Sequence, residues 1–313
     1  MSELTRIGVV GVGSIGKNHA RICAELADAQ FSAVFDINRE SAEAIAVQYG
    51  AKVASSLDEF ISLIDAATVA APTPVHYEIG STLLVHGKHV LIEKPITETP
   101  AQAEDLVRLA RERSLILQVG HIERFNPILS ALEQRLTRPR FIESHRLTPY
   151  PFRSVEIGVV LDLMIHDLEI ILHLVRSPVK SIDAVGVPVL SKGEDIANAR
   201  IRFENGCVAN VTASRISPEK MRKIRVFQED AYLSLDYQAQ AGEIYRLVNG
   251  QITRESLAME KEEPLKRELQ SFVECARRGL QPVVSGSVAT AALELAIEIT
   301  EMINAFVASQ RNP

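Results

Sequence analysis

The sequence predicts an α/β protein made of a doubly wound parallel sheet followed by an α+β domain with an open, mainly antiparallel sheet. Over residues 5–119, short β-rich runs alternate with helical patterns, which is typical of βαβ units. From residue 139 onward the pattern alternates, and Asn205-Gly206 and Asn249-Gly250 indicate hairpins whose two turn positions need positive φ. A chain of 313 residues is too long for one ordinary core, so we predict two domains, 1–122 and 123–313.

Six strands are expected in the first domain, and most are followed by a helix. The strands cover residues 5–10, 31–35, 52–54, 67–71, 89–92 and 115–119. Helical patterns lie between them at residues 15–26, 39–48, 75–85 and 101–113, and Ser56 is placed to cap a further brief helix. Right-handed crossovers wind such units into an open sheet with helices on both faces.

The second domain is expected to be a run of hairpins. A helix reaches Leu136, and strands are predicted at residues 140–147, 181–189, 197–203, 208–215, 223–228, 232–235 and 243–247. Two helices near 265–278 and 287–307 close the chain. A sheet with one face on helices and one free face is a natural surface for a homodimer or homotetramer, although a solvated face fits the same alternation.

Composition excludes several classes of function. The net charge of -6 argues against a general nucleic-acid binder. Three cysteines lack CxxC spacing, so neither a disulfide framework nor a metal site is suggested. No signal-peptide pattern is present, and the longest apolar run is interrupted by charged residues before it reaches the roughly 20 residues that span a bilayer. We expect a cytoplasmic protein with no membrane or nucleic-acid partner.

The first strand-to-helix turn reads Gly11-Val-Gly13-Ser14-Ile15-Gly16, a dinucleotide-binding fingerprint in its expected context. Gly11 permits the tight turn, Gly13 lets the backbone approach a pyrophosphate, and Gly16 allows close helix packing. The helix then presents unpaired N–H groups to the phosphates. A purely structural glycine turn is the alternative.

Asp36 ends the second predicted strand, 20 residues after Gly16. An acid at this point accepts hydrogen bonds from an adenosine ribose and repels a 2′-phosphate, so NAD is favoured over NADP. Arg39 lies nearby and keeps NADP open. A surface Asp without a ligand is the alternative interpretation.

Two further loops follow later strands, at the edge where ligands bind in such sheets. The first, Ala71-Pro-Thr73-Pro-Val-His76, supplies polar groups. The second, Glu93-Lys94-Pro95, places a lysine at the rim of the crevice, and the proline makes a helical conformation at Lys94 unfavourable. Taken alone, Lys94 also fits a solvated loop lysine.

The apolar stretch 159–174 raises a question, because it carries Asp162 and His166. An ionised carboxylate buried without partners is costly, so these groups must be paired or face a cleft. Their i, i+4 spacing places them on one face of a helix. A buried, hydrogen-bonded Asp–His pair is the bland alternative to a catalytic one. His173 and Glu169 continue near the same stripe and are expected to be structural.

Together these motifs resemble those of the Gfo/Idh/MocA oxidoreductase family. The glycine turn with Asp36, the Pro-Thr-Pro-x-His loop, Glu93-Lys94-Pro95 and Asp162-x-x-x-His166 occur in the same order and spacing, over nearly the whole chain. The resemblance implies an N-terminal Rossmann domain that binds NAD(P), a C-terminal domain for substrate binding and oligomerisation, and a sugar, polyol or nucleotide-sugar substrate. It also implies that Lys94 touches substrate and nicotinamide ribose, that Asp162 orients substrate, and that His166 transfers the proton.

The remaining candidates lie near the expected nicotinamide end of the cleft or in a basic cluster. Family members line that end with residues at the positions of His121 and Arg124, although a helix-capping or interdomain salt-bridge role fits Arg124 equally well. Arg153 and Arg215 join the basic run 220–225 as a solvated face or as an anion site that clamps a phosphate.

The substrate expected from the resemblance is a nucleotide sugar such as UDP-N-acetylglucosamine, oxidised to a 3-keto sugar, because residues 120–127 and 159–167 look most like members with that activity. An inositol or free-sugar dehydrogenase is the alternative enzyme. A non-catalytic, nicotinamide-binding redox sensor is the alternative from another class.

Overall fold

The computed structural model describes residues 4–150 and 157–311, which fall into two compact units. The first unit comprises Met1–Ile122 and Glu263–Thr290, and the second comprises Glu123–Glu262 and Ala291–Pro313. The predicted division at residue 122 assigned 263–290 to the second domain, whereas in the structure this segment returns to the first unit.

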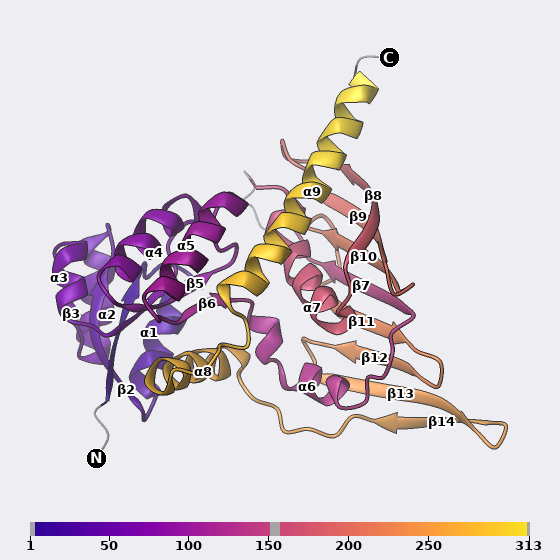
Figure 1. The fold of residues 1–313 in the computed structure, drawn as a ribbon, viewed down its shortest axis with the longest axis horizontal. Coiled ribbons are helices and arrows are strands. Elements are labelled where there is room, and N and C mark those ends of the chain that lie inside the picture. The colour runs from indigo at the N-terminus through magenta and orange to yellow at the C-terminus, as the bar shows by residue number, and fades with distance from the viewer. Residues whose placement is uncertain (1–3, 151–156, 312–313) are drawn as a thin grey trace. The chain divides into compact units, whose positions relative to one another are not determined.

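The first unit contains a six-stranded parallel sheet in the order β3-β2-β1-β4-β5-β6 (Figure 1). Its strands are β1 (Thr5–Val10), β2 (Ala29–Phe35), β3 (Lys52–Val53), β4 (Ala66–Val69), β5 (His89–Glu93) and β6 (Leu117–Gly120). The helices of this unit are α1 (Gly16–Glu25), α2 (Arg39–Tyr49), α3 (Leu57–Ser62), η1 (Thr73–Val75), α4 (His76–Val85), α5 (Pro100–Glu112) and α8 (Pro264–Arg278). The doubly wound parallel sheet predicted from the sequence is confirmed.

Local capping fixes where several of these helices begin. The Ser56 side chain accepts a hydrogen bond from the Glu59 backbone, as predicted, and so satisfies one of the unpaired N–H groups of α3. Thr99 and Gln102 form a reciprocal capping box at the start of α5, and Pro100 occupies its first position. These ends are set by neighbouring residues alone, which is why a sequence pattern can predict them.

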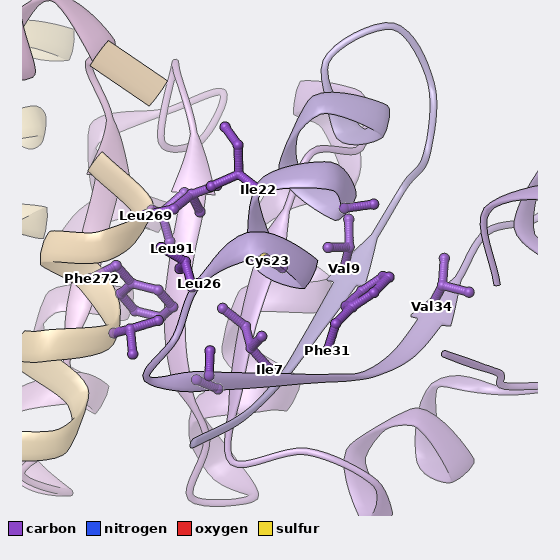
Figure 2. Packing of buried hydrophobic residues seen from close by; sticks show 14 of the residues in the cluster. Ile7, Val9, Ile22, Cys23, Leu26, Phe31, Val34, Leu91, Leu269 and Phe272 are labelled. Atoms are coloured by element: carbon purple, nitrogen blue, oxygen red, sulfur yellow. The ribbon is translucent and has the colours of Figure 1, made fainter. Parts of the chain in front are cut away.

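Helix α8 contributes to the core of the first unit. Leu265, Leu269, Phe272 and Val273 of this helix belong to the same buried cluster as residues of β1, α1 and β2. Figure 2 shows Leu269 and Phe272 beside the side chains of Leu26 and Leu91. This apolar stripe explains why α8 returns to a sheet that precedes it by more than a hundred residues, a pairing that no local pattern indicates.

The second unit is built on an eight-stranded sheet in the order β14-β13-β12-β11-β7-β10-β9-β8 (Figure 1). Its strands are β7 (Phe141–Leu147), β8 (Val179–Val187), β9 (Ile196–Phe203), β10 (Val208–Ser214), β11 (Met221–Phe227), β12 (Tyr232–Asp236), β13 (Ala241–Val248) and β14 (Gln251–Ser256). Its helical elements are η2 (Ile122–Phe125), α6 (Pro127–Glu133), η3 (Val160–Met164), α7 (Ile165–Val175) and α9 (Gly286–Arg311). Elements η2 and α9 each begin with residues that belong to the first unit. Only the β7–β10 pair is parallel, so the sheet is mainly antiparallel, as predicted.

The two predicted hairpins differ in their turns. Asn249 and Gly250 both have positive φ, 51° and 76°, as a two-residue turn requires. At Asn205-Gly206 the positive φ is confined to Gly206, at 87°, because four residues separate β9 from β10 and a longer loop needs one left-handed position. Strand β14, which follows Gly250, was not predicted, since its six side chains are all exposed and its sequence has no apolar alternation.

The two faces of the second sheet differ in character. Ile142, Ser144 and Arg146 of β7 are buried on the face that carries α7, where Ser144 and Arg146 bond to Asp167. On neighbouring strands, a row of partly exposed aromatic rings joins Phe141, Phe227, Tyr232 and Tyr245, with successive ring centroids 5.6, 4.8 and 5.4 Å apart. Among the described helices, none is both long and apolar enough to cross a membrane.

If α8 is part of the hydrophobic core of the first unit, Phe272→Ala will lower the stability of the protein. The Phe272 side chain is fully buried, so its truncation should lower the free energy of unfolding by about 3–5 kcal/mol. The exposed neighbour Gln270 provides the control, and Gln270→Ala should change that free energy by no more than about 0.5 kcal/mol. Urea unfolding followed by circular dichroism measures both values, and equal costs would contradict this placement of α8.

Candidate functional site

The carboxyl edge of the first sheet gathers the predicted cofactor residues. The strand order reverses between β1 and β4, which continue into the glycine turn and into Ala71. Strands β5 and β6 lie next in order and end at Glu93 and Gly120, so their loops share this edge. In open parallel sheets the ligand crevice lies outside the strand ends at such a reversal.

The glycine turn has the space that a dinucleotide needs. Gly11 has φ +81°, and a Cβ there would lie 2.9 Å from the Ala70 backbone. A Cβ on Gly16 would lie 1.8 Å from the Gly11 carbonyl oxygen, so α1 can approach the turn only without a side chain. A Cβ on Gly13 would meet nothing within 4 Å. Since the fold itself does not require Gly13, the open space beside it fits a pyrophosphate.

The start of α1 also suits an anion. Its N-cap position, Ile15, makes no side-chain hydrogen bond, whereas α2, α3 and α5 are all capped by a side chain. Ser14 and Ile15 are exposed at this turn. Uncapped N–H groups at the positive end of a helix are a common phosphate site, so the residues present fit a dinucleotide cofactor.

Asp36 buttresses the glycine turn. Its carboxylate accepts one hydrogen bond from the Val12 backbone and another from the Asn38 backbone, each at 2.7 Å. A carboxylate has about four acceptor positions, so capacity remains for ribose hydroxyls. Arg39 forms an ion pair with Glu43 at 2.8 Å on α2. These contacts leave the choice between NAD and NADP open.

The residues on both sides of Lys94 are held by buried histidines. Glu93, which is 9% exposed, lies 3.0 Å from Nε2 of the fully buried His19 and accepts a second bond from the Lys94 backbone at 3.3 Å. His76 lies 2.9 Å from the Pro95 carbonyl oxygen through Nδ1 and 2.8 Å from the Ala71 carbonyl oxygen through Nε2. The Lys94–Pro95 peptide bond is cis.

These contacts bear on the predicted cofactor ligands. Both ring nitrogens of His76 face backbone carbonyl oxygens, and one oxygen of Glu93 faces His19, so the observed contacts favour a supporting role for both residues. Ala71 and Thr73 lie at the edge itself, while His121 is buried just after β6. Their contact with a cofactor stays a prediction.

Helix α8 adds an acid to the same interior. The carboxyl group of Glu268 is fully buried, and neither oxygen has a hydrogen-bond partner among the described residues. Burial, and then the charge of Glu93, raise the pKa of Glu268 well above its usual value. The side chain of Gln118 donates to the Glu268 backbone carbonyl at 3.1 Å and fixes the helix there. The raised pKa favours the uncharged form of the Glu268 carboxyl group.

The second unit explains the acid and the imidazole in the apolar stretch. The π-helical turn η3 contains Asp162 and passes directly into α7, whose first turn contains His166. Both side chains are half-buried, whereas Val160 and Met164 are fully buried. Asp162 and His166 thus keep partial exposure in a segment in which Leu161 and Leu163 are also half-buried. Such π-turns occur frequently at functional sites.

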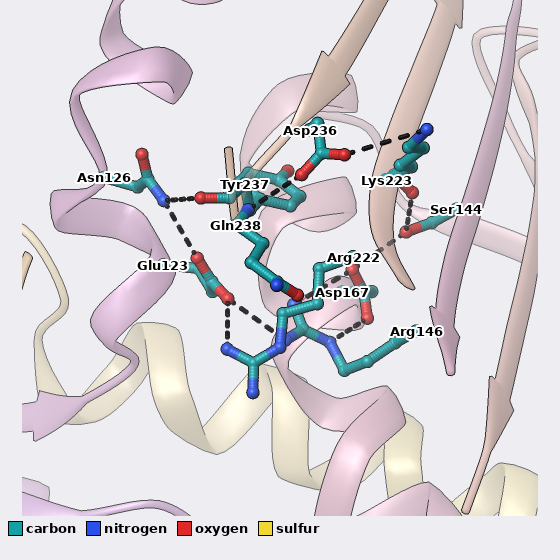
Figure 3. Close-up of polar contacts among 10 residues, drawn as sticks. All are labelled: Glu123, Asn126, Ser144, Arg146, Asp167, Arg222, Lys223, Asp236, Tyr237 and Gln238. Carbon is teal, nitrogen blue, oxygen red and sulfur yellow. Dashed lines mark hydrogen bonds and ion pairs between the residues drawn. The ribbon is translucent and has the colours of Figure 1, made fainter. Parts of the chain in front are cut away.

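Figure 3 shows how the next residue, Asp167, is neutralised. Arg146 donates to Asp167 at 2.6 Å and to Glu123 at 3.1 Å, and Ser144 donates to Asp167 at 2.8 Å. Burial by itself lowers the pKa of Arg146, but the charges of Asp167 and Glu123 outweigh it, so the pKa is raised and Arg146 stays charged. The buried acid of this segment is thus satisfied by the sheet beneath it.

Two predicted substrate-binding arginines have structural contacts. Arg215 is fully buried and donates to Asp195 at 3.0 Å and to the Ile157 carbonyl at 2.7 Å. Arg124 donates to Glu169 at 2.5 Å inside the second unit. Burial, only partly offset by Arg124, raises the pKa of Glu169 to about 7. These contacts favour a structural role for both arginines, which the sequence left open for Arg124, and their contact with substrate stays a prediction.

The basic run 220–225 is divided by strand alternation rather than gathered into one patch. Ile224 and Val226 of β11 are buried, so Arg222 shares their face and bonds to Glu123 at 3.4 Å. Lys223 and Arg225 lie on the opposite face, where they pair with Asp236 and Glu143. Arg153 lies outside the described residues. No potential metal-binding group of three or more His, Cys, Asp or Glu occurs within residues 4–150 and 157–311.

The fold and the glycine edge together define a dinucleotide-binding oxidoreductase. Comparison with known proteins identifies the family. The chain matches the NAD-binding Rossmann-fold profile of the Gfo/Idh/MocA oxidoreductases over residues 5–121 and the family's C-terminal domain over residues 132–234. The chain belongs to the Gfo/Idh/MocA oxidoreductase family and is a dehydrogenase.

Named relatives extend the similarity over nearly the whole chain. The UDP-N-acetylglucosamine 3-dehydrogenase of Acidithiobacillus ferrooxidans is 33% identical, over 96% of this chain and 98% of the relative. Its solved structure superposes with a TM-score of 0.93, covering 97% and 99% of the two chains. The scyllo-inositol 2-dehydrogenase (NAD(+)) of Bacillus subtilis is 26% identical, over 96% of this chain and 94% of the relative.

Several residues of these two sites were not singled out in the sequence. His19 and Glu268 belong to no sequence motif. Both interact with Glu93, which is distant from them in the sequence. His19 does follow Gly16 by three residues on the face that also buries Ala20 and Cys23. A polar side chain on that buried face was the available signal.

The buried acid Glu268 makes a prediction about pH. Because its pKa is raised in the folded state, the folded protein keeps a proton that the unfolded chain releases above about pH 4.3, so its contribution to stability declines as pH rises. Glu268→Gln removes this penalty. We expect its thermal midpoint to exceed that of the wild type at pH 8, with the difference shrinking toward pH 4.

The matched control is Glu274→Gln on the same helix, where the carboxylate is exposed and pairs with Arg278 at 3.0 Å. This variant should not gain stability at pH 8. A Glu268→Gln variant whose thermal midpoint tracks the wild type at every pH would show that Glu268 carries no such penalty.

Proposed function

We propose that this dehydrogenase uses NAD to oxidise a sugar hydroxyl to a ketone, and that its substrate is a nucleotide sugar such as UDP-N-acetylglucosamine, converted to the 3-keto product. The observation that carries the proposal is the 33% identity to a UDP-N-acetylglucosamine 3-dehydrogenase over 96% of this chain. Lys94, Asp162 and His166 of this chain, in motifs that resemble those of the family, support it. The named activity belongs to that relative, and its transfer to this chain is the step to be tested.

The proposed mechanism assigns one task to each side chain. A bound nicotinamide would accept the hydride from the carbinol carbon. The ammonium of Lys94 stabilises the negative charge that develops on the hydroxyl oxygen. His166 accepts the hydroxyl proton, which an imidazole can do because its ordinary pKa is near neutrality. Asp162, one helical turn before His166, orients the sugar.

An inositol or free sugar is the alternative substrate. The observation in its favour is the 26% identity to a scyllo-inositol 2-dehydrogenase over 96% of this chain. A panel of UDP-sugars, free sugars and inositols, followed by NADH absorbance and product analysis, separates the two. Turnover confined to unphosphorylated polyols would reject the nucleotide sugar and leave the dehydrogenase intact.

A non-catalytic redox sensor is the alternative from another class. A sensor needs the cofactor edge of the first unit and has no use for Lys94, Asp162 and His166 together, so their joint presence favours catalysis.

We also propose a homodimer or homotetramer that forms through the open face of the second sheet, where the aromatic row Phe141–Phe227–Tyr232–Tyr245 is partly exposed. Light scattering of the full chain tests the assembly.

The mechanism predicts a separation of binding from turnover. Lys94→Ala should spare NAD affinity and abolish turnover, and His166→Asn should lower kcat by about 100-fold, the usual contribution of general acid–base help. Cofactor fluorescence titration and steady-state kinetics measure the two quantities. The control is Lys88→Ala, on the α4–β5 loop at the opposite edge of the sheet, which should turn over like the wild type. Wild-type rates in Lys94→Ala would remove its proposed role.

The proposed NAD preference depends on Asp36. Asp36→Ala should raise KM for NAD by about 10-fold or more, through the lost ribose contact and the loosened Val12 turn, and should raise the NADP-to-NAD ratio of kcat/KM. Glu40→Ala, an exposed acid in the first turn of α2, is the control for a general change of charge. Equal use of NAD and NADP by the wild type would refute the preference.

A further inference from the structure

Two buried histidines contact the residues on either side of Lys94. His19 Nε2 lies 3.0 Å from a carboxylate oxygen of Glu93, the residue before it. His76 Nδ1 lies 2.9 Å from the carbonyl oxygen of Pro95, the residue after it. The two histidines are 0% and 1% exposed, so water has almost no access to their rings. Lys94 is the single residue between the two bonded positions.

Each histidine belongs to a different cofactor loop. His19 lies in α1, three residues after Gly16 of the glycine turn. His76 begins α4, and its second ring nitrogen lies 2.8 Å from the carbonyl oxygen of Ala71, at the end of β4. The turn that carries Lys94 is therefore linked to the loops after both strands at which the sheet order reverses.

The packing around Glu93 leaves its carboxylate little alternative. A Cβ on Gly120 would lie 2.9 Å from that carboxylate, so the group fills the space above the β6 end. Its second oxygen accepts from the Lys94 backbone N–H. Removing the His19 donor would leave a nearly buried carboxylate short of one partner, and the strain would be taken up by the turn next to Lys94.

We propose that His19 and His76 are positioning residues that hold Lys94 from both sides and tie it to the two cofactor loops. Lys94 then keeps its place relative to the glycine turn without adjustment during the reaction. The inference rests on the proposed function of Lys94. A misplacement of about 1 Å at a catalytic group can cost about 100-fold in rate, so a link of this kind has a measurable effect on turnover.

The amide side chains of Asn and Gln give a crossed test. An Asn amide nitrogen occupies the place of a histidine Nδ1, and a Gln amide nitrogen occupies the place of Nε2. His19→Gln therefore keeps the donor to Glu93, and His19→Asn loses it. At position 76 the roles are exchanged. His76→Asn keeps the donor to the Pro95 carbonyl oxygen, whereas His76→Gln loses that donor and places its amide nitrogen near the Ala71 carbonyl oxygen instead.

We expect kcat of His19→Asn to be at least about 10-fold below that of His19→Gln, and kcat of His76→Gln to be at least about 10-fold below that of His76→Asn. Because Asn is the damaging residue at one site and Gln at the other, a general intolerance of either residue cannot produce this result.

His89→Gln is the control for a purely structural loss. The ring of His89, at the amino end of β5, accepts a hydrogen bond from the Ile116 backbone at 3.0 Å, far from the ligand edge of the same strand. This variant should lower the thermal midpoint and leave kcat unchanged. Thermal midpoints of all five variants are measured beside the kinetics, and either histidine pair suffices if a variant of the other fails to fold.

Lys94→Ala is assayed in parallel with whichever substrate the wild type oxidises. If Lys94→Ala turns over normally, the proposed function of Lys94 fails. If Lys94→Ala is inactive while kcat is equal within each histidine pair, the positioning inference alone is overturned. A drop in kcat that follows the thermal midpoint in every variant, His89→Gln included, would likewise overturn it.

Discussion

The close approach of α1 to the glycine turn is the constraint on which the first unit depends. It is possible only because Gly16 has no side chain, since a Cβ there would overlap the Gly11 carbonyl oxygen. Once α1 is seated, its buried face brings His19 to Glu93 and offers Ile22 and Cys23 to the core that α8 completes. The same feature that opens an anion site at the helix start therefore also anchors the turn that carries Lys94.

The second unit follows a different rule, in which buried charge is neutralised pair by pair. Arg146 lies between Asp167 and Glu123, Arg215 meets Asp195, and Arg124 meets Glu169. Each arginine comes from a segment other than that of its acid, and the Arg146–Asp167 pair joins β7 to α7. Breaking such a pair leaves an uncompensated charge, which typically costs about 3–5 kcal/mol. The polar residues of the apolar stretch are thus divided: Asp167 and Glu169 stabilise the unit, while Asp162 and His166 keep partial exposure.

Local features of the fold could be predicted from the sequence, and distant pairings could not. The glycine turn, the Ser56 cap and the Asn249-Gly250 turn depend on neighbouring residues and appear where the pattern places them. Helix α8 was assigned to the wrong unit because its apolar stripe does not say which core receives it. The acid partners of Arg124 and Arg215 could not be predicted for a related reason, since they lie 45 and 20 residues away in the chain and share no local pattern with the arginines. Contact of either arginine with substrate stays a prediction.

The division of labour between the units bears on substrate choice. The cofactor edge consists of backbone turns and of groups that suit a dinucleotide, together with Lys94, whose proposed contact is the hydroxyl oxygen common to all candidate sugars. Discrimination must come from side chains around the proposed proton acceptor, on α7 and the strands beneath it. There, Arg146, Arg124 and Arg215 are committed to buried acids, whereas Arg222 on the same face of the sheet is 41% exposed and bonded to Glu123 only at 3.4 Å. Burial and the neighbouring charge of Arg146 lower the pKa of Arg222, so an added anion would be stabilising at that position. A diphosphate-bearing substrate supplies such an anion and an inositol does not, so the electrostatics of Arg222 are consistent with the proposal of a nucleotide sugar.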